Sequence, residues 1–590
     1  MLNISVRLQD AAAHLWHVSC AWNVAVASPQ QTLNLADWVP GSYMIRDFSR
    51  HIIRMQAFHN ETAIALQALD KSRWALQAAS GEYRVEYEVY AYDWSVRASY
   101  LDERGAFFDG ACLFPWLDGR QHEAYQIHVD LGEWGRAQQW QIATAMQPIA
   151  ANRFQAASYW EAIDHPFTLG LFRQYDFEAA GIPHHIILSG QTLPFDEDRL
   201  LADVEKICEA QIELFGVAPF GHYVFMLYIG DHIYGGLEHR ASTALMADRW
   251  SLPRLGAKER GDEYLQLLGL FSHEYFHAWN VKSIKPAAFD PYELHHEQHT
   301  EQLWAFEGIT SYYDDLMLQR SGVMSTPQYL SQLAKTITRV EQGAGSHKQS
   351  LAQSSFDAWT KYYKQNENSA NAIVSYYQKG ALAALVLDLY LRRETDGEFS
   401  LDDVMRALYR RYLQDGRGIS EQDWRALACE VTGVDVQDLL RRMIDRTDAL
   451  PLAEVLVDFG LSLHRVARSD KEAGWVATLP PHHMMVETAF GAKYSVDASG
   501  LKINSVSNGG SAEKAGLTVG DVVVAVANLS TSQFDAVWHS LQVGDSVGVH
   551  YFRQGVLYHT QMPVLAQAAT TVLLHTEDEQ LLSYWLPQWQ

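Results

Sequence analysis

The chain of 590 residues is too long for a single hydrophobic core, so its length predicts three or four domains. Apolar residues make up 48% of the sequence and charged residues 20%, which is the balance of a folded globular protein rather than a disordered one. Acidic residues outnumber basic ones by 71 to 46, and the net charge of −25 argues against binding to nucleic acid or to an anionic membrane surface.

Neither the first residues nor the cysteines indicate export. The N-terminus lacks the basic region and apolar run of a signal peptide, and no stretch approaches the roughly 18 to 20 apolar residues that span a bilayer. The cysteines form no CxxC pair, which favours free thiols in a reducing compartment over a disulfide framework or a thiolate metal site. We therefore expect a cytoplasmic protein without a membrane span. The four cysteines are Cys20, Cys112, Cys208 and Cys429.

Hydrophobic periodicity divides the chain into segments of different structure. Residues 1–177 are predicted to form an N-terminal β-sheet domain, since apolar and charged residues alternate there, for example over residues 82–89. Helical periodicity dominates residues 178–450. Residues 451–566 return to short strands and glycine turns, and residues 567–590 are expected to form a C-terminal tail. The prediction is a multi-domain α+β fold with a mainly helical middle domain.

A helix predicted to begin near Asp262, its expected N-cap, carries the sequence HEYFH. Because residues four apart share one helical face, His273 and His277 can direct their imidazoles at one point. Imidazole nitrogens at about 2 Å are what Zn²⁺ accepts, and Glu274 between them can act as the base for a metal-activated water. The alternative is two solvated histidines on an ordinary helix, but the apolar residues around the motif indicate burial, and buried imidazoles need partners.

A catalytic zinc needs a third protein ligand and leaves one coordination position open. Glu307 follows His277 on a second predicted helix, over residues 300–320, and is a lone carboxylate among apolar and aromatic neighbours. Such a group is paired, metal-bound or strongly shifted in pKa. We therefore predict one zinc ion per chain, held by His273, His277 and Glu307.

A second histidine group, formed by His295, His296 and His299, also has two members four residues apart. No base lies suitably between them, and neighbouring glutamates make the segment polar all round. We predict a solvated loop there, which could border the active-site cleft.

Other polar residues could support the predicted zinc site. Asp314 and Asn280 are candidates to orient the metal ligands from behind. Asp109 could reach the cleft from the β domain.

The motifs resemble those of the gluzincin metallopeptidases, and more closely those of the glycyl aminopeptidase family that carries a C-terminal PDZ domain. The resemblance covers nearly the whole chain and rests on WVPGSYMIRDF at residues 38–48, HEYFHAWNVK at residues 273–282 and LWAFEG at residues 303–308. It implies a thermolysin-like zinc catalytic domain over residues 178–450 and an aminopeptidase that prefers small N-terminal residues such as Gly or Ala.

One further stretch, GGLEH at residues 235–239, resembles the exopeptidase motif of the related aminopeptidase N group. The resemblance implies that Gly235 and Gly236 bind the substrate backbone and that Glu238 pairs with the free α-ammonium. A carboxylate at a fixed distance from zinc would admit only the first peptide bond. This chain has Leu and His where that group commonly has Met and Asn, and an ordinary strand-end glycine turn is the alternative.

The sequence YQKG at residues 377–380 resembles a YEKG stretch of the same group, whose Tyr hydrogen-bonds the developing oxyanion. By position Tyr377 takes this role. Tyr376 is adjacent and leaves the register open by one residue, and a tyrosine packed on a helix is the alternative.

The C-terminal residues 500–523 resemble a PDZ domain of the bacterial protease type, with Phe490, Gly491 and Ala492 as its carboxylate-binding loop. PDZ domains bind extended peptide ends by β-augmentation, so a peptide C-terminus could occupy this groove. A purely structural module packed on the catalytic domain is the alternative.

Several functions stay open from the sequence. The first is a zinc metallopeptidase that acts on peptides with a free N-terminus, with Glu274 as base and Tyr377 holding the oxyanion. A zinc endopeptidase replaces it if Glu238 does not bind the amine. A PDZ-type peptide-binding adaptor with a structural zinc site is a second class. Hydrolysis of a non-peptide such as an epoxide is a third, which no sequence feature favours.

Overall fold

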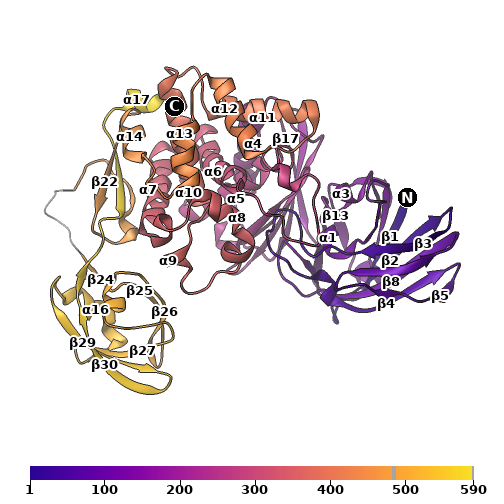
Figure 1. Cartoon of the computed structure of the whole chain (residues 1–590), viewed down its shortest axis with the longest axis horizontal. Helices are drawn as coiled ribbons and strands as arrows, with labels where there is room; N and C mark the ends of the chain where they lie inside the picture. Colours follow the sequence, from indigo (N-terminus) through magenta and orange to yellow (C-terminus); the bar gives the residue numbers. More distant parts are fainter. Residues whose placement is uncertain (481–486, 588–590) are drawn as a thin grey trace. The chain divides into compact units, whose positions relative to one another are not determined.

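The computed structural model of the chain describes residues 1–480 and 487–587. The chain forms two compact units, each assembled from separate stretches of sequence. The first unit comprises Met1–Gln298, Tyr313–Val323 and Leu408–Ser420, and the second comprises His299–Tyr312, Met324–Ala407 and Glu421–Gln590. Strands dominate the N-terminal part, helices the middle and strands again the C-terminal part, as the sequence predicted (Figure 1).

The N-terminal part of the first unit is built around an eight-stranded sheet with the order β14-β15-β12-β1-β2-β8-β4-β5. Strand β8 (Gly81–Tyr90) alternates its side chains and turns Tyr83, Val85 and Tyr87 into the core, so the strand predicted over residues 82–89 is confirmed. The other strands are β1 (Leu2–Asp10), β2 (Leu15–Val24), β4 (Ile52–His59), β5 (Thr62–Ile64), β12 (Tyr125–Asp130), β14 (Gln147–Ala150) and β15 (Arg153–Ala156).

Two four-stranded sheets and three short helices complete this N-terminal part, and the sheets have the orders β13-β16-β10-β9 and β11-β3-β7-β6. Their strands are β3 (Ser28–Asn34), β6 (Gln67–Ala68), β7 (Arg73–Ala78), β9 (Ser99–Leu101), β10 (Gly105–Phe108), β11 (Trp116–Leu117), β13 (Gln141–Ala143) and β16 (Phe167–Gly170). The helices are α1 (Gly110–Leu113), α2 (Gly132–Ala137) and α3 (Tyr159–Ala162).

A five-stranded sheet with the order β17-β18-β19-β21-β20 forms the rest of the first unit's framework. Strands β18, β19 and β21 are parallel, and β20 is an antiparallel strand at the edge of the sheet. Helix α5 packs against β20, β21 and helix α4. The bounds are β17 (Arg173–Ala179), β18 (Ile182–Gly190), β19 (Tyr223–Gly230), β20 (Gly235–Glu238), β21 (Ser242–Asp248), α4 (Glu197–Phe215) and α5 (Asp262–Phe276).

A buried aromatic cluster holds α5 against this sheet. Tyr275 of α5 packs on Tyr223 and Phe225 of β19, and its hydroxyl lies 2.8 Å from Nε2 of His184 on β18. The Nδ1 of His184 lies 2.8 Å from the Ile182 carbonyl, so Nδ1 carries the proton and Nε2 accepts from the Tyr275 hydroxyl. Burial lowers the pKa of His184 to about 4, because a charged imidazole would lose its hydration there.

The second unit is helical around α10 (Gln378–Glu394), which packs against the π-helical turn η4 (Trp304–Gly308). Two glycines allow this approach, since a Cβ on Gly308 would lie 2.6 Å from the Cα of Gly380. Other helices of this unit are α7 (Thr326–Gln342), α8 (Leu351–Phe356), α9 (Ser369–Ala372), α12 (Glu421–Thr432), α13 (Gln437–Leu440) and α14 (Leu452–Val457). Helices α6 (Ile309–Arg320) and α11 (Leu401–Asp415) have residues in both units.

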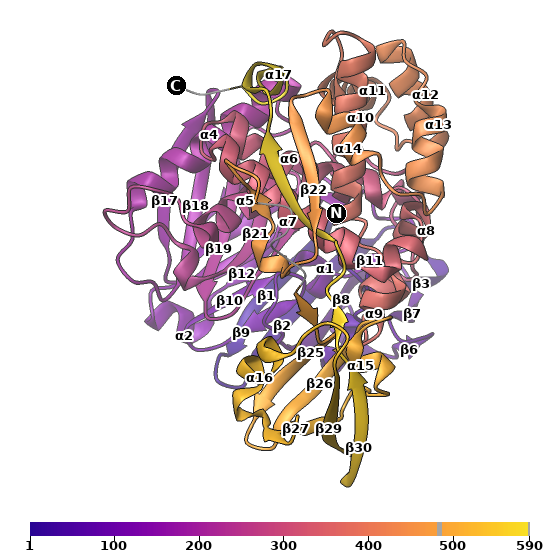
Figure 2. The ribbon, with the colours of Figure 1, turned by 90° about the vertical axis from the view of Figure 1, so that its left-hand side faces the viewer.

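The C-terminal part of the second unit contains a six-stranded sheet packed with α15 (Ser511–Lys514) and α16 (Phe534–Ser540) (Figure 2). Its core includes Phe490, Phe534 and Trp538, whose rings contact one another. The strands are β25 (Ala492–Asp497), β26 (Gly500–Val506), β27 (Val522–Val526), β28 (Leu529–Ser530), β29 (Ser546–Arg553) and β30 (Val556–Pro563). A separate sheet joins β22 (Leu461–Val466), β32 (Thr571–Thr576) and β23 (Gly474–Trp475).

The multi-domain architecture with a β-rich N-terminal domain and a helical middle region is thus confirmed. The four predicted segment boundaries, the thermolysin-like catalytic domain and the PDZ domain stay predictions.

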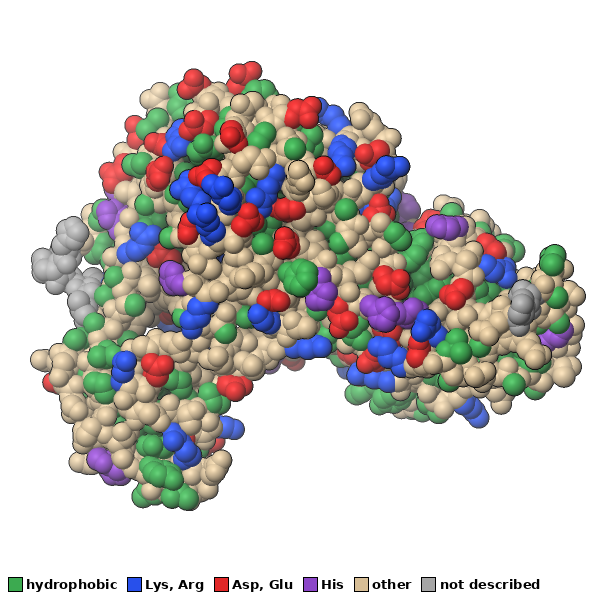
Figure 3. Space-filling model, in the orientation of Figure 1, with side chains coloured by type: hydrophobic (Ala, Val, Ile, Leu, Met, Phe, Trp, Pro, Cys, Tyr) green, Lys and Arg blue, Asp and Glu red, His purple; other side chains and the backbone are tan. Residues whose placement is uncertain are grey.

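Acidic side chains are scattered over the face of the molecule drawn in Figure 3. No helix within residues 1–480 and 487–587 combines the length and apolar character needed to cross a bilayer.

The buried His184 predicts how stability depends on pH. Its pKa is about 4 in the folded chain and about 6.5 when unfolded, so the unfolded state binds more protons between these values. Its contribution to stability is full above pH 6.5 and is lost as the pH falls towards 4. We expect His184→Gln to reduce the drop in melting temperature between pH 7 and pH 4.5 by a few degrees. His232→Gln is the control, because that ring is 98% exposed; equal pH slopes in both variants would contradict the assignment.

Candidate active site

Two histidines of α5 present their ring nitrogens to each other. The Nε2 atoms of His273 and His277 lie 3.1 Å apart, and the two rings meet edge to face. The helix begins at Asp262 with Gly261 as its N-cap, so the expectation that Asp262 caps the helix is wrong; Asp262 instead lies in the first turn, where an acidic residue complements the helix dipole. The side chain of His273 is 15% exposed and His277 is buried.

The other ring nitrogen of each histidine is fixed by an acceptor. Nδ1 of His273 lies 3.0 Å from Oδ2 of Asp314, and Nδ1 of His277 lies 2.8 Å from the carbonyl oxygen of Asn280. Because carboxylate and carbonyl oxygens only accept, both Nδ1 atoms donate, and both Nε2 atoms keep a lone pair. Asp314 and Asn280 therefore orient the two imidazoles, as the sequence suggested.

Two nitrogen lone pairs 3.1 Å apart repel each other unless a proton or a metal cation lies between them. Two imidazole ligands of a tetrahedral zinc ion at about 2.0–2.1 Å stand about 3.3 Å apart. The paired nitrogens thus fit a divalent metal ion in both chemistry and spacing.

Glu307 lies in the buried turn η4, which continues without a break into α6. Asp314, the carboxylate that contacts His273, follows seven residues later on the same continuous helix. His273, His277 and Glu307 each offer one ligand atom, and these atoms lie within 4.8 Å of one another. π-helical turns inside helices are frequent at functional sites. Here the π-helical turn η4 contains Glu307 itself.

Glu274 is buried in the first unit, and its Oε2 has no hydrogen-bond partner within the described part of the chain. Burial raises its pKa to about 7, although the nearby rings of His273 and His277 oppose this shift. The backbone of Gly236 on β20 lies directly against this carboxylate, where any Cβ would overlap it. A glycine at this position therefore lets the edge strand approach the base.

Glu238, at the end of β20, is a buried carboxylate with an unused acceptor. It is 4% exposed, and its Oε1 has no hydrogen-bond partner among the residues that the structure describes. Ligand-type oxygens of Glu238 and Glu274 and a nitrogen of His277 lie within 4.8 Å of one another. Gly41, which has φ +98°, faces the Glu238 carboxylate so closely that a Cβ there would lie 2.5 Å from Oε1. Lys282 lies close enough for Glu238 to help raise its pKa, yet Oε1 keeps an unused acceptor for a further cation.

Tyr376 and Tyr377 precede α10 in the second unit and differ in exposure. Tyr376 is fully buried, and its hydroxyl has no hydrogen-bond partner among the described residues, whereas Tyr377 is half-buried. Burial raises the pKa of Tyr377 well above its usual range, and the charge of Glu307 adds to this shift. Glu307 is thus close enough to Tyr377 to affect it, and Tyr377 is the more accessible of the two phenols.

Asp109 belongs to a buried row of charged groups next to Glu238. Its Oδ1 accepts from the Ala111 amide, while Oδ2 lies 3.7 Å from Nε2 of His239. Nδ1 of His239 lies 3.5 Å from Oδ1 of Asp164, which also pairs with Nζ of Lys282 at 2.6 Å. Apart from Asp109, this row was missed from the sequence, because its members come from distant segments.

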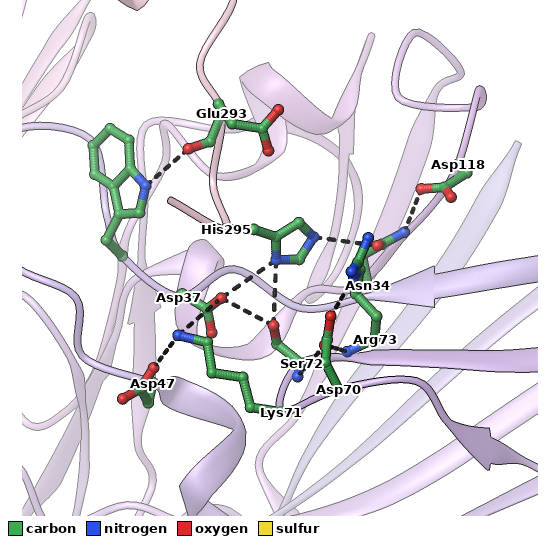
Figure 4. A network of polar contacts seen from close by, with 11 residues as sticks. Asn34, Asp37, Asp47, Asp70, Lys71, Ser72, Arg73, Asp118, Glu293 and His295 are labelled. Atoms are coloured by element: carbon green, nitrogen blue, oxygen red, sulfur yellow. Dashed lines mark hydrogen bonds and ion pairs between the residues drawn. The ribbon is translucent and has the colours of Figure 1, made fainter. Parts of the chain in front are cut away.

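The histidine group around residue 295 is not a solvated cluster (Figure 4). His295 faces Asp37 Oδ2 through Nδ1 at 3.3 Å and Asn34 Oδ1 through Nε2 at 3.2 Å, and its side chain is 13% exposed. Asp37 also accepts from the Ser72 hydroxyl at 2.9 Å. The predicted loop is present and His296 and His299 are exposed, but the expectation of solvation is wrong for His295, which the N-terminal residues bind.

Comparison with known proteins identifies the chain's relatives. The family model for M61 glycyl aminopeptidase matches residues 266–383, and the model for the peptidase M61 N-terminal domain matches residues 3–171. The search among curated proteins found no match.

Solved structures give a second comparison. An aminopeptidase N family protein from Idiomarina loihiensis is 37% identical, with 100% of both chains covered and a TM-score of 0.94. An M1 zinc metallopeptidase from Deinococcus radiodurans is 12% identical over 76% of this chain and 94% of its own, with a TM-score of 0.48, which is too remote to support an argument.

The fold, the paired histidines and the family models define a peptidase. More specifically, the chain belongs to the M61 glycyl aminopeptidase family.

Proposed function

We propose that this peptidase is a zinc-dependent aminopeptidase that releases small N-terminal residues such as Gly or Ala. The observation that carries the zinc assignment is the pair of Nε2 lone pairs 3.1 Å apart on His273 and His277. Glu307 is the proposed third ligand, supported by its continuity with the helix of Asp314 and by the 4.8 Å grouping of the three ligand atoms. We propose one zinc ion per chain.

In this proposal the metal supplies Lewis acidity, which lowers the pKa of water and polarises the scissile carbonyl. Glu274 takes the proton of the attacking water and returns it to the leaving amine. Tyr377 donates its hydroxyl to the developing oxyanion, which its partial exposure and its closeness to Glu307 support.

Glu238 is the proposed receptor for the substrate's α-ammonium, and the glycines at 235 and 236 are proposed to bind its backbone. A buried carboxylate with an unused acceptor gains most from a cation that arrives with the substrate. An endopeptidase needs no such receptor.

The C-terminal sheet is proposed to be a PDZ-like domain over residues 451–566, with a tail over 567–590. The open edge of β25 beside α16 and the left-handed Gly491 (φ +75°) support a groove for a peptide C-terminus. The remaining proposed domains are residues 1–177 and 178–450, and the proposed location is the cytoplasm. An adaptor function is disfavoured by membership of a peptidase family.

The contact between Asp314 and His273 predicts that a change at Asp314 weakens zinc binding. Asp314→Asn should weaken zinc binding about 10- to 100-fold, because the ligand loses the partner that fixes its tautomer. The matched control is Asp315→Asn, since that neighbouring carboxylate makes no hydrogen bond to His273 and acts on the ring only through its charge. Dissociation constants from competition with a chromophoric chelator provide the measurement, and equal affinities of both variants would refute the role of Asp314.

If Glu274 is the catalytic base, a variant at this position should still bind zinc but should turn substrate over slowly. Glu274→Gln should retain stoichiometric zinc by metal analysis while kcat on alanine p-nitroanilide falls by at least about 10²-fold, because the amide cannot accept the proton. Near-normal turnover in this variant would show that another group is the base.

If Glu238 binds the substrate's α-ammonium, cleavage should require a peptide with a free N-terminal amine. The wild type should cleave Ala-Ala peptides and leave their N-acetylated forms intact, and Glu238→Gln should lower kcat/KM on the free peptide about 10- to 100-fold, the loss of one charge-assisted bond. Equal cleavage of free and acetylated peptides by the wild type would replace the aminopeptidase with an endopeptidase.

A further inference from the structure

The N-terminal β domain contributes a cation to the edge strand β20. Nη2 of Arg97, which precedes β9, donates to the carbonyl oxygen of Gly236 at 2.8 Å. Among residues 1–480 and 487–587, strand β20 pairs only with β21, so this carbonyl points to the open edge. The N–H and C=O of one strand residue point to the same side, and the pattern repeats every second residue. Gly236 and Glu238 therefore present their backbone to the edge where Arg97 lies.

Arg97 has donors left over after this bond. Its Nε is buried and has no hydrogen-bond partner among the described residues, and no carboxylate of those residues lies within 4 Å of its guanidinium. The arginine itself is fixed, since its amide donates to Ser95 Oγ at 3.2 Å. Nη1 lies beside Gly235, where a Cβ would come 3.5 Å from it. The charge of Arg97 acts on the Glu274 carboxylate and helps to lower its pKa, but without a direct ion pair, so the remaining donors can bind a carbonyl or carboxylate oxygen.

The position of Arg97 along the strand defines which part of a substrate it would meet. Gly236 and Glu238 are two residues apart, which is about 7 Å along a strand. An extended dipeptide also spans about 7 Å from its amine to its carboxyl end. A substrate whose α-ammonium pairs with Glu238 and whose backbone follows β20 would place the carboxyl group of its second residue at Arg97.

We propose that Arg97 binds the C-terminal carboxylate of dipeptide substrates, making this enzyme selective for dipeptides with a small first residue. The proposal rests on the aminopeptidase function and on Glu238 as the amine receptor. Longer peptides offer Arg97 a neutral carbonyl, which gives a weaker bond than a carboxylate. Amides and anilides of single amino acids offer it neither group. Arg97 also fixes the Gly236 carbonyl, so it positions the edge strand as well.

The test compares three substrates in four forms of the full-length enzyme loaded with zinc. The substrates are Ala-Ala, its C-terminal amide and alanine p-nitroanilide, and the enzymes are the wild type, Arg97→Met, Arg97→Lys and Arg104→Met. Arg104 is the matched control because it is 77% exposed and pairs with Asp102. The decisive quantity is the ratio of kcat/KM for Ala-Ala to kcat/KM for the anilide.

We expect Arg97→Met to lower this ratio about 10- to 100-fold, mainly through KM, with an intermediate change for the amide relative to the anilide. Arg97→Lys should recover part of the ratio, because lysine keeps the positive charge but lacks the paired N–H donors of the guanidinium. Arg104→Met should leave the ratio unchanged. An equal loss on all three substrates would show that Arg97 only supports the strand and would overturn the proposal. No loss on Ala-Ala would overturn it too. If the wild type cleaves none of the three substrates, the proposed aminopeptidase function itself is refuted.

Discussion

The arrangement of the site depends on two imidazole lone pairs that the fold forces to within 3.1 Å of each other. The carboxylate of Asp314 and the carbonyl of Asn280 hold each Nδ1, so neither ring can turn its proton towards the other. Without a proton or a metal ion between the two nitrogens this contact is repulsive, and a metal ion there would be chelated by both rings. The binding energy of the proposed metal ion would thereby be coupled to the packing of α5, because Tyr275 on the same helix is fixed to His184 of the sheet.

Glycines let two carboxylates lie against the backbone near the first unit's edge strand. Gly236 brings β20 against Glu274, and Gly41 brings the N-terminal domain against Glu238. These contacts explain the stretch around Trp38 structurally. Asp37 and Trp38 bind residues 293–295, and Gly41 lies against the Glu238 carboxylate. The N-terminal β domain is therefore part of the proposed substrate site, through Gly41 and Arg97, and more than a scaffold.

The sequence predicted what depends on local periodicity. The spacing of His273 and His277 follows from 3.6 residues per turn, and the strand over residues 82–89 follows from alternation, so both could be read directly. Glu307 was recognisable as a lone carboxylate in an apolar helix, although its π-helical turn was not.

What depends on contacts between distant segments could not be predicted. The polar neighbours of His295 suggested solvent, yet its partners Asn34 and Asp37 lie more than 250 residues earlier. Arg97 has no local signal at all, because its significance comes only from the Gly236 carbonyl. The helix start was misassigned for a related reason, since Asp262 and Gly261 are both acceptable N-caps and only the backbone decides between them.

The most direct measurement is the anomalous scattering of a zinc-loaded crystal on the two sides of the zinc absorption edge. We expect one strong peak per chain, about 2.0–2.2 Å from Nε2 of His273, Nε2 of His277 and a carboxylate oxygen of Glu307. A peak at other side chains, or a protein that binds no zinc with these nitrogens still in contact, would contradict it.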